Sequence, residues 1–454
     1  MKTFRWKSYL GVVLLSLGGF ALGMALFRLL PAAPIAVNWN TTRQTIDGFG
    51  ASATGYSEAF SAAQADRFFS PTTGLGLSLL RIRVIAGMTD ADCGCAANST
   101  PYSCIQGSKS QIGSGDLKIA QLAAARGVRL FAAPWSPPPI MKSSGKSCTS
   151  GSVIGNAANY SAYATDLASF PSLLHAYGLS ITAISVQNEP DVSNPDYETC
   201  TWTAQQIHDF IPYLSSALHT SGFGGIRIGV PEEGGWTFEL MDKSMEDSAV
   251  ASDVGLIMGH AYGVDKPSGI PPSNGRPVWQ TEVCDPHKYD GTMKNALKWA
   301  RSIHNYMSIG ANVWMYWSLD CGPRFYNKDD NMCLTDQKSN FAKRAYVLGQ
   351  YAKFIRPGWQ RVDVTNKGSL LVTAYKGPGN EFAIVATNKN LWPSRNQTFV
   401  LNGLTSQRSR VTPWITSASA SLTPQPPVAL RSDGRTFSYS IPARSVVTFQ
   451  GQGD

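Results

Sequence analysis

Residues 183–190 read Ala-Ile-Ser-Val-Gln-Asn-Glu-Pro and give the strongest single indication of the architecture. An apolar, β-type run ends here in an amide, a carboxylate and a proline. In parallel α/β architectures the reactive side chains lie at the carboxyl ends of the strands. The stretch therefore predicts one strand of a parallel sheet with candidate catalytic groups at its end.

Short β-type runs alternate with helical stretches over about 300 residues around this strand, as expected for strand–helix units. Eight runs are strand candidates: Gly48–Ala53, Leu77–Val84, Arg129–Ala133, Ala183–Gln187, Ile226–Val230, Gly255–His260, Val278–Thr281 and Asn312–Trp317. Helical patterns between them include Leu117–Arg126, Tyr160–Tyr177, Ala204–Thr220 and Thr292–Met307. Eight such units predict an α/β fold of the (β/α)8, or TIM barrel, type.

Helical periodicity disappears beyond Arg356-Pro357-Gly358, and six strand-like runs separated by turn residues follow. They predict a fused C-terminal β-sandwich. We expect four segments: a signal peptide or membrane anchor over 1–33, a strand joining the β-domain over 34–46, the catalytic barrel over 47–355, and the β-sandwich over 356–454.

The N-terminus resembles a targeting segment. Lys2, Arg5 and Lys7 precede an uncharged apolar run over 10–27, which predicts export of the chain that follows. The run is long for a signal peptide, so cleavage and an uncleaved anchor both stay open. The 8 cysteines fit an oxidising compartment, with Cys321 and Cys333 as a local pair. We expect a secreted, periplasmic or extracellular protein that contacts a membrane only if the leader is retained.

The net charge of +8 is spread along the chain without a basic run, so we expect a solvated surface and no nucleic-acid partner. No nucleotide-binding glycine motif occurs and the cysteine spacing does not match a zinc module. We therefore expect no cofactor and no metal. We also expect a monomer.

Two strand ends carry carboxylates: Glu189 after the fourth strand and Glu282 after the seventh. The interval spans three units of about 31 residues, the average of a ~250-residue barrel. Two carboxylates across one cleft are what glycoside hydrolysis requires, one as acid/base and one as nucleophile. A single strand-end glutamate is often only a surface charge. Glu232 and Glu233, after the fifth strand, are rival carboxylates that we interpret as loop charges.

Other strand ends supply matching groups. Arg81 lies inside an apolar strand and needs a carboxylate partner, which Glu282 can provide. Trp135, in a proline-rich turn, suits a sugar platform. On the eighth strand Trp314 and Trp317 lie three positions apart, so one faces the cleft and the other the helices. Candidate substrate-binding residues are Asn188, Trp135, His260, Tyr262, Trp317 and Arg81.

These strings are similar to family 30 of the glycoside hydrolases. The similarity is carried by residues 46–52 (Ile-Asp-Gly-Phe-Gly-Ala-Ser), 76–81 (Gly-Leu-Ser-Leu-Leu-Arg), 134–138 (Pro-Trp-Ser-Pro-Pro), 186–190 (Val-Gln-Asn-Glu-Pro), 280–282 (Gln-Thr-Glu), 354–358 (Phe-Ile-Arg-Pro-Gly) and 441–448. The resemblance implies a barrel with a side β-domain, retention of configuration, Glu189 as acid/base and Glu282 as nucleophile. It also implies that Asn188 bonds the substrate 2-hydroxyl and that Trp135, His260, Tyr262 and Trp317 line the site.

The family includes glucuronoxylanases, endo-β-1,6-glucanases and β-1,6-galactanases, among others. Residues 186–191 look most like the xylanase branch, which implies an exported endo-β-1,4-xylanase acting on plant cell-wall polysaccharide. The arginine that glucuronoxylan-specific members use has no clear counterpart, although Arg324 is a possible substitute. The alternatives are a β-1,6-glucanase or galactanase, an exo-acting β-glycosidase, and a carbohydrate-binding protein on a hydrolase fold.

Overall fold

The computed structural model describes residues 33–56, 60–86, 104–106, 110–147, 149–322, 329–365, 367–394, 396–405 and 409–451. The expected leader lies outside these residues, apart from its last position. In the described part of the chain, no helix is both long enough and apolar enough to cross a bilayer.

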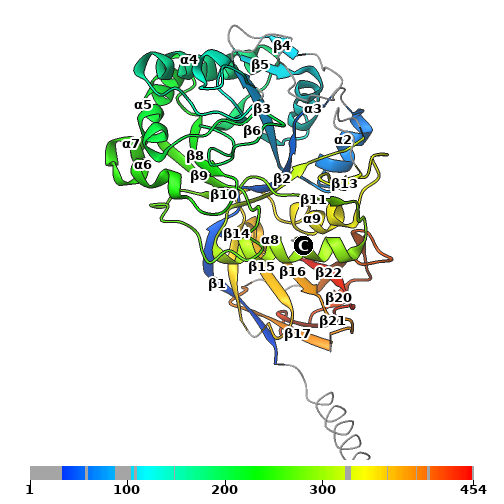
Figure 1. The fold of residues 1–454 in the computed structure, drawn as a ribbon. Coiled ribbons are helices and arrows are strands. Elements are labelled where there is room, and N and C mark those ends of the chain that lie inside the picture. The colour runs from blue at the N-terminus through cyan, green and yellow to red at the C-terminus, as the bar shows by residue number, and fades with distance from the viewer. Residues whose placement is uncertain are drawn as a thin grey trace, which may run out of the picture.

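Two bodies are visible in Figure 1, an α/β body and a β-domain beneath it. The α/β body is built on eight parallel strands: β2 (Gly48–Ala53), β3 (Leu79–Ala86), β6 (Arg129–Pro134), β7 (Ile181–Ser185), β8 (Arg227–Glu233), β9 (Val254–Gly259), β10 (Val278–Gln280) and β12 (Val313–Ser318). They follow the order β2-β12-β10-β9-β8-β7-β6-β3, and pairing between β2 and β3 closes the ring. The predicted fold class, a TIM barrel with a fused β-domain, is confirmed.

Helices surround this ring: α2 (Ala62–Phe69), α3 (Ser114–Ala124), α4 (Ala157–Ala176), α5 (Ala204–Thr220), α6 (Asp242–Glu246), α7 (Ser248–Asp253), α8 (Met293–Ile309) and α9 (Lys343–Ala352). Polar caps mark where several of them begin. Thr203 and Gln206 form a capping box at α5, and Asn156 and Thr292 cap α4 and α8. Short 3-10 turns lie at Pro139–Met141, Glu239–Met241 and Pro378–Asn380.

Alternation along each barrel strand sorts side chains between the interior and the helices. Leu79, Phe131, Trp279 and Met315 belong to a buried cluster contributed by barrel strands alone. Leu80 and Ile82, on the other face of β3, belong to the larger core that includes the helices. Arg81 shares the inward face of β3 with Leu79, so its guanidinium is directed into the barrel.

Four short strands lie at the barrel's periphery. The hairpin of β4 (Cys104–Gln106) and β5 (Ser110–Gly113) pairs onto the end of β3. Strands β11 (Asp285–Lys288) and β13 (Asp330–Asn331) form a separate antiparallel pair after β10 and β12.

The β-domain contains β1 (Ile35–Thr45), β14 (Gln360–Thr365), β15 (Leu371–Lys376), β16 (Phe382–Asn388), β17 (Asn396–Asn402), β18 (Arg410–Thr416), β19 (Thr423–Pro424), β20 (Val428–Ala429), β21 (Thr436–Ser440) and β22 (Ser445–Gly451). All ten are hydrogen-bonded into one sheet around its own apolar core. Strand β1 pairs antiparallel with β14 and parallel with β17, so the start of the chain lies inside the C-terminal domain.

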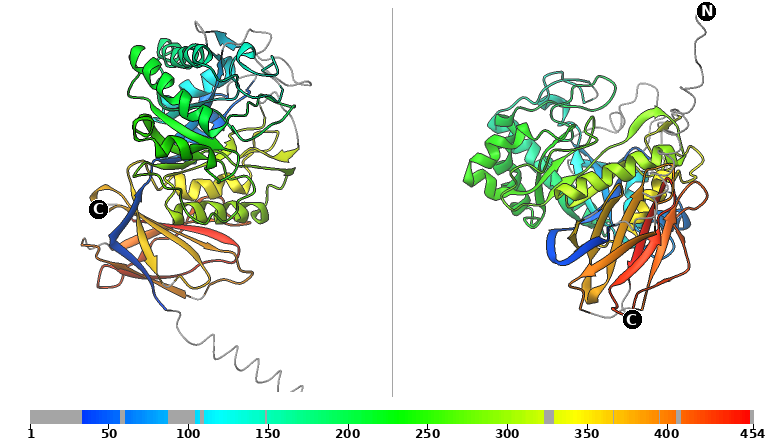
Figure 2. Two further views of the ribbon diagram at one scale, coloured as in Figure 1. Left: turned by 60° about the vertical axis from the view of Figure 1, so that its left-hand side comes forward. Right: turned by 90° about the horizontal axis from the view of Figure 1, so that it is seen from below.

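The β-domain packs against α8 and α9 of the barrel, an arrangement that all views in Figures 1 and 2 share. Phe354 contacts Trp414 at 5.2 Å between ring centroids. Gln350 of α9 donates to Thr416 Oγ1 at 2.9 Å, and its carbonyl accepts from Thr448 Oγ1 at 2.7 Å. The two bodies therefore share a packed and hydrogen-bonded interface.

Candidate active site

Glu189 lies just past the carboxyl end of β7, where the backbone turns sharply. The amide of Asn188 donates to the carbonyl of Pro134 at 2.8 Å, and the amide of Glu189 donates to the carbonyl of Glu232 at 3.0 Å. The turn places Glu189 in the left-handed region, with φ of 47°, a conformation that a non-glycine residue adopts at some energetic cost. Neighbouring strands β6 and β8 thus fix the direction of the carboxylate.

Glu282 follows the carboxyl end of β10 and is held by contacts to its carboxylate. Tyr262 donates a hydroxyl hydrogen bond to Oε1 at 2.8 Å, and Arg81 Nη1 lies 2.7 Å from Oε2. The carbonyl of Glu282 also accepts from the amide of Ala261 at 3.0 Å. Each carboxylate oxygen therefore has its own partner: Arg81 from within β3 for one, and Tyr262 from beyond β9 for the other.

The two carboxylates lie close together at the carboxyl end of the barrel. One oxygen each from Glu189 and Glu282, together with a ring nitrogen of His260, lie within 4.8 Å of one another. All three side chains are buried, with no more than 6% of any of these residues exposed. The distance between the oxygens brings them near enough to act on opposite sides of one bond.

Arg81 connects several groups of this cluster beneath the carboxylates. Besides Glu282, its guanidinium contacts Asn188 Oδ1 at 2.5 Å through Nη2 and Glu232 Oε1 at 3.1 Å through Nε. Burial alone would lower the pKa of Arg81, but Glu232 and Glu282 outweigh burial and raise it. Arg81 is therefore a permanent positive charge in the cluster.

His260, after β9, is the second positive group. Its Nδ1 lies 3.2 Å from Glu189 Oε1 and 3.8 Å from Glu282 Oε1, and its Nε2 lies 3.6 Å from Glu232 Oε1. Burial would lower the pKa of His260, but the surrounding carboxylates, Glu282 foremost, raise it to about 10. The imidazole is therefore protonated at neutral pH.

The pKa values of the two glutamates move in opposite directions while His260 is charged. Burial raises the pKa of Glu282, and the nearby charge of Glu189 adds to this effect, against His260 and Arg81. For Glu189 the hydrogen bonds from His260 and Tyr197 outweigh burial, and its pKa is lowered. The site thus gives two chemically identical carboxyl groups different pKa values.

Aromatic side chains line the adjoining wall. Trp135 and Trp317 lie 5.2 Å apart between centroids with planes at 31°, and Trp135 meets the ring of Tyr197 at 6.0 Å. Tyr197 in turn donates to Glu189 Oε2 at 3.0 Å. Trp314, by contrast, points to α8, where its Nε1 donates to Ser302 Oγ at 3.2 Å. Strand β12 therefore presents one tryptophan to each side, as its alternation predicts.

The interpretation of Glu232 and Glu233 as loop charges was wrong. Both end β8 and are at most 1% exposed. Glu232 contacts Arg81 and His260, whereas Glu233 turns away and accepts from the amides of Phe238 and Leu240. Because Glu232 also lies at the carboxyl end of a barrel strand, the strand-end rule itself could have found it. Tyr197 was missed as well, since it lies in a long loop without a pattern.

Glu189, His260 and Glu282 are close enough to hold a metal ion by distance alone. However, Arg81 already lies 2.7 Å from Glu282, and His260 directs a ring nitrogen toward Glu189. A guanidinium and an imidazolium supply the positive charge that an ion would bring. We therefore interpret the cluster as a paired-charge site rather than a metal centre.

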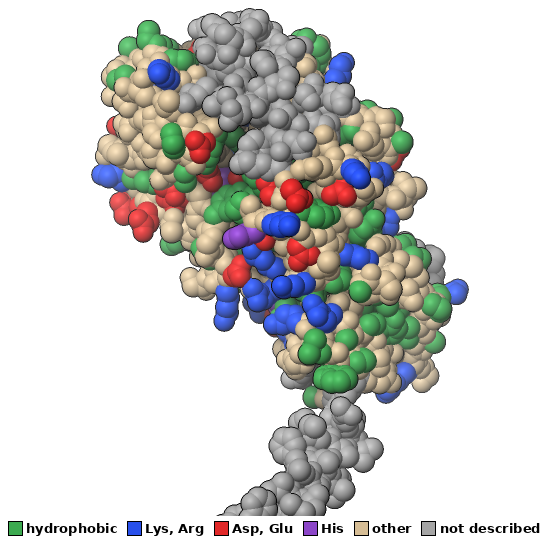
Figure 3. All heavy atoms as spheres, turned by 45° about the vertical axis from the view of Figure 1, so that its right-hand side comes forward, with side chains coloured by type: hydrophobic (Ala, Val, Ile, Leu, Met, Phe, Trp, Pro, Cys, Tyr) green, Lys and Arg blue, Asp and Glu red, His purple; other side chains and the backbone are tan. Residues whose placement is uncertain are grey.

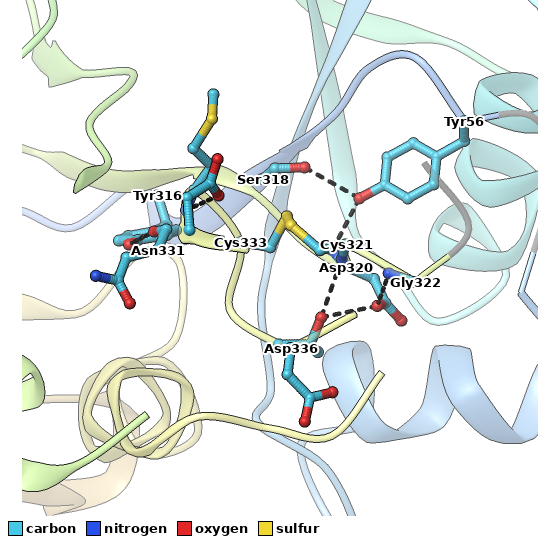
Figure 4. The surroundings of a disulfide bond; sticks show 12 residues. Tyr56, Tyr316, Ser318, Asp320, Cys321, Gly322, Asn331, Cys333 and Asp336 are labelled. Carbon is cyan, nitrogen blue, oxygen red and sulfur yellow. Dashed lines mark hydrogen bonds between the residues drawn. A yellow bond between two sulfur atoms is a disulfide. The ribbon is translucent and has the colours of Figure 1, made fainter. Parts of the chain in front are cut away.

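A disulfide fixes the segment that follows β12 (Figure 4). Cys321 and Cys333 are bonded, as the expected local pair predicts. Tyr56 links this segment to the barrel, because its hydroxyl accepts from the amide of Asp320 at 2.8 Å and lies 3.1 Å from Ser318 Oγ. Arg324, the expected substitute for a glucuronate-binding arginine, lies outside the described residues.

Basic side chains gather where the barrel meets the β-domain in Figure 3. On α8, Lys298 lies 3.6 Å from Asp285 and Arg301 lies 2.7 Å from Asp265. Each of these cations is therefore partly compensated by an acidic neighbour, and neither contacts the carboxylate cluster.

A parallel barrel that holds two buried carboxylates at the carboxyl ends of its strands has the arrangement of a glycoside hydrolase. The chain belongs to glycosyl hydrolase family 30, whose TIM-barrel domain matches residues 47–313. It is 30% identical over 445 residues to glucuronoxylanase XynC of Bacillus subtilis (strain 168), covering 94% of both chains. The predicted family and the predicted class of enzyme are thereby confirmed.

Solved structures agree with this assignment. The family 30 subfamily 8 xylanase Xyn30A from Clostridium acetobutylicum is 31% identical and superposes with a TM-score of 0.76, covering 92% of this chain and 99% of that one. The endo-β-1,6-glucanase BT3312 superposes with a TM-score of 0.68 over 92% of this chain and 94% of its own, at 19% identity. At that identity the second match concerns the fold alone.

Proposed function

We propose that the protein is an exported, retaining endo-β-1,4-xylanase that cleaves plant cell-wall xylan by double displacement. The carrying observation is the placement of oxygens from Glu189 and Glu282 within 4.8 Å of each other. Retaining glycosidases hold their two carboxyl groups ~5–5.5 Å apart, whereas inverting enzymes need ~6.5–9.5 Å to admit a water. The relatives named as xylanases support the choice of substrate.

In the first step, Glu282 attacks the anomeric carbon while Glu189 donates its proton to the glycosidic oxygen. The glycosidic bond breaks, the leaving saccharide departs as an alcohol, and a glycosyl ester forms on Glu282. In the second step, Glu189 takes a proton from water, whose oxygen attacks the same carbon. The ester breaks, the sugar leaves with its original configuration, and both carboxyl groups return to their starting states.

The assignment of roles rests on the kind of charge beside each carboxyl group. Arg81, on Glu282, is charged at every working pH, and Tyr262 also donates to Glu282. His260, on Glu189, carries a charge that it can lose as a proton. With His260 protonated, the pKa of Glu189 is lowered and that of Glu282 is raised, which is the reverse of what the first step needs, so the mechanism requires Glu189 to gain its proton as substrate enters. We assign the ionised nucleophile to Glu282 because its partner Arg81 is permanently charged, and the proton-carrying role to Glu189.

The aromatic wall supports a sugar-binding role. Trp135 packs against Trp317 and against Tyr197, which bonds Glu189. Asn188, which Arg81 fixes, is the proposed partner of the hydroxyl next to the anomeric carbon. Export is supported by the basic and apolar leader of the sequence and by the Cys321–Cys333 disulfide, which persists in oxidising compartments. Fractionation of cells expressing the full chain, with N-terminal sequencing, tests export and cleavage.

Product analysis tests the activity. Glucuronoxylan, arabinoxylan, β-1,6-glucan, β-1,6-galactan and aryl β-glycosides are incubated with the wild type, with Glu282→Gln and with Glu246→Gln, an exposed control on α6. We expect oligosaccharides from the xylans, none with Glu282→Gln, and normal products with Glu246→Gln. Proton NMR of the first product reports its anomeric configuration. Inversion, or an active Glu282→Gln protein, would refute the mechanism, and products from a β-1,6 polymer alone would refute the xylanase assignment.

A further inference from the structure

Glu232 is a third carboxylate beneath the pair that the proposed reaction uses. It is 0% exposed, so no substrate can reach it. Its φ of 62° lies in the left-handed region, which a non-glycine residue adopts only at an energetic cost. The carbonyl of Glu232 accepts from the amide of Glu189 at 3.0 Å. A strained, buried charge at this position indicates that the surrounding structure makes use of it.

The first neighbour of Glu232 is Arg81. Both Nε and Nη2 of the guanidinium lie 3.1 Å from Glu232 Oε1. The remaining nitrogen, Nη1, contacts Glu282, and Nη2 contacts Asn188 as well as Glu232. Since a guanidinium is planar and rigid, fixing one edge fixes the direction of the other.

The second neighbour is His260. Its Nε2 lies 3.6 Å from Glu232 Oε1 and has no hydrogen-bond partner among the described residues. Its Nδ1, on the opposite side of the ring, faces Glu189 at 3.2 Å. Glu232 is thus the anion nearest to the Nε2 side, while Glu189 and Glu282 lie on the Nδ1 side.

We propose that Glu232 is a positioning residue for the glycoside hydrolysis inferred above: its carboxylate fixes the Arg81 guanidinium and the His260 imidazole, and through them Glu282 and Glu189. This proposal rests on the proposed function for its effect on turnover. Its effect on His260 is independent of the reaction.

The charges around His260 give the expected direction of change. Glu189 after β7, Glu232 on β8 and Glu282 after β10 all face the ring, and Arg81 on β3 lies behind Glu232. The Tyr262 ring packs against the imidazole at 5.9 Å. Removing one of three anions leaves less negative charge to hold the imidazolium, so the pKa of His260 falls from its raised value.

The experiment compares Glu232→Gln, which keeps shape and removes charge, with Glu232→Asp, which keeps charge and removes a methylene. The matched control is Glu198→Gln, another buried carboxylate paired with a buried arginine, since Glu198 lies 2.8 Å from Arg83. Circular dichroism verifies folding, and the His260 imidazole is followed by NMR across pH 5 to 11. The pH profile of kcat/KM is measured on the xylan cleaved by the wild type.

We expect Glu232→Gln to lower the pH at which His260 titrates by at least one unit. The basic limb of the pH profile of kcat/KM should move to lower pH, and kcat should fall about 10-fold or more. Glu232→Asp should lie closer to the wild type, and Glu198→Gln should titrate as the wild type does. Unchanged His260 titration with kcat within twofold in Glu232→Gln would overturn the proposal. If that variant does not fold, Glu232→Asp carries the test: its withdrawn carboxylate should lower the His260 titration and kcat by smaller amounts, and wild-type values of both would overturn the proposal. A failed xylanase assignment leaves the NMR outcome intact, so the two failures are distinguishable.

Discussion

Arg81 Nη1 and Glu282 Oε2 lie 2.7 Å apart although 201 residues separate them in the chain. The contact joins the second barrel strand in sequence to the seventh. It exists because closure of the ring brings all strand ends to one rim, where an inward arginine from β3 meets a glutamate from β10. Both groups are buried, so each charge stabilises the other.

Replacing Glu189 by Gln removes the proposed proton donor but keeps its volume. We expect kcat to fall by about 10²–10⁴-fold, the usual contribution of general acid–base catalysis. The loss should be largest for substrates with poor leaving groups, because these need protonation most. A series of aryl β-xylosides or xylo-oligosaccharides of graded leaving-group pKa measures this dependence. A loss of equal size across the series would remove the acid role.

The raised pKa of His260 makes stability depend on pH. Its folded value is about 10, and the ordinary value in an unfolded chain is ~6.5. Because the folded value is higher, this stabilisation is complete below about pH 6.5 and is lost as pH rises through 10. Urea unfolding at pH 6 and pH 9.5 should show a drop in the free energy of unfolding. The drop should be smaller in His260→Gln, and an equal drop in both proteins contradicts the assignment.

Trp317→Ala should weaken substrate binding more than turnover. The ring lies against Trp135, and in the proposed reaction it would contact the sugar equally in the ground state and the transition state. We expect KM to rise about 10-fold, equivalent to about 1.4 kcal/mol, with a smaller change in kcat. Trp392→Ala is the control, since that side chain is 71% exposed on the β-domain. A similar rise of KM in the control would point to a nonspecific effect.

Removing the disulfide should cost stability without removing the reaction. The double variant Cys321→Ser/Cys333→Ser opens a loop whose ends are 12 residues apart in sequence. Loss of a disulfide typically lowers the free energy of unfolding by about 2–4 kcal/mol. Thermal unfolding measures the change. Cys200→Ser, at a buried free cysteine, shows what loss of a thiol alone does. Because the disulfide holds the segment after Trp317, we also expect KM to rise. An unchanged Tm would show that the hydrogen bonds around Asp320 are enough to hold this segment.

The barrel could be predicted because its strands are local patterns. Each apolar run between helical stretches is visible without knowledge of the rest of the chain, and the strand-end rule then located Glu189 and Glu282. Strand β14 escaped because its sequence, Gln-Arg-Val-Asp-Val-Thr, directly follows the turn at Arg356-Pro357-Gly358 and carries few apolar residues.

The network around the carboxylates could not be predicted in the same way. Two adjacent glutamates, Glu232 and Glu233, have the same local sequence signal, yet one turns to Arg81 and the other caps a turn at Phe238. Which does which depends on the backbone conformation at Glu232 and on partners from β3 and β9. Such information lies in three-dimensional contacts between distant segments rather than in any window of the sequence.

The position of β1 has a consequence for the order of events during synthesis. Ile35–Thr45 leaves the ribosome long before its partners β14 and β17, which begin at residues 360 and 396. The strand must therefore wait, with its backbone unpaired, until almost the whole chain exists. Contacts of such long sequence separation slow folding and prolong aggregation-prone intermediates. Truncated nascent chains should expose this strand to chaperones until the last hundred residues emerge.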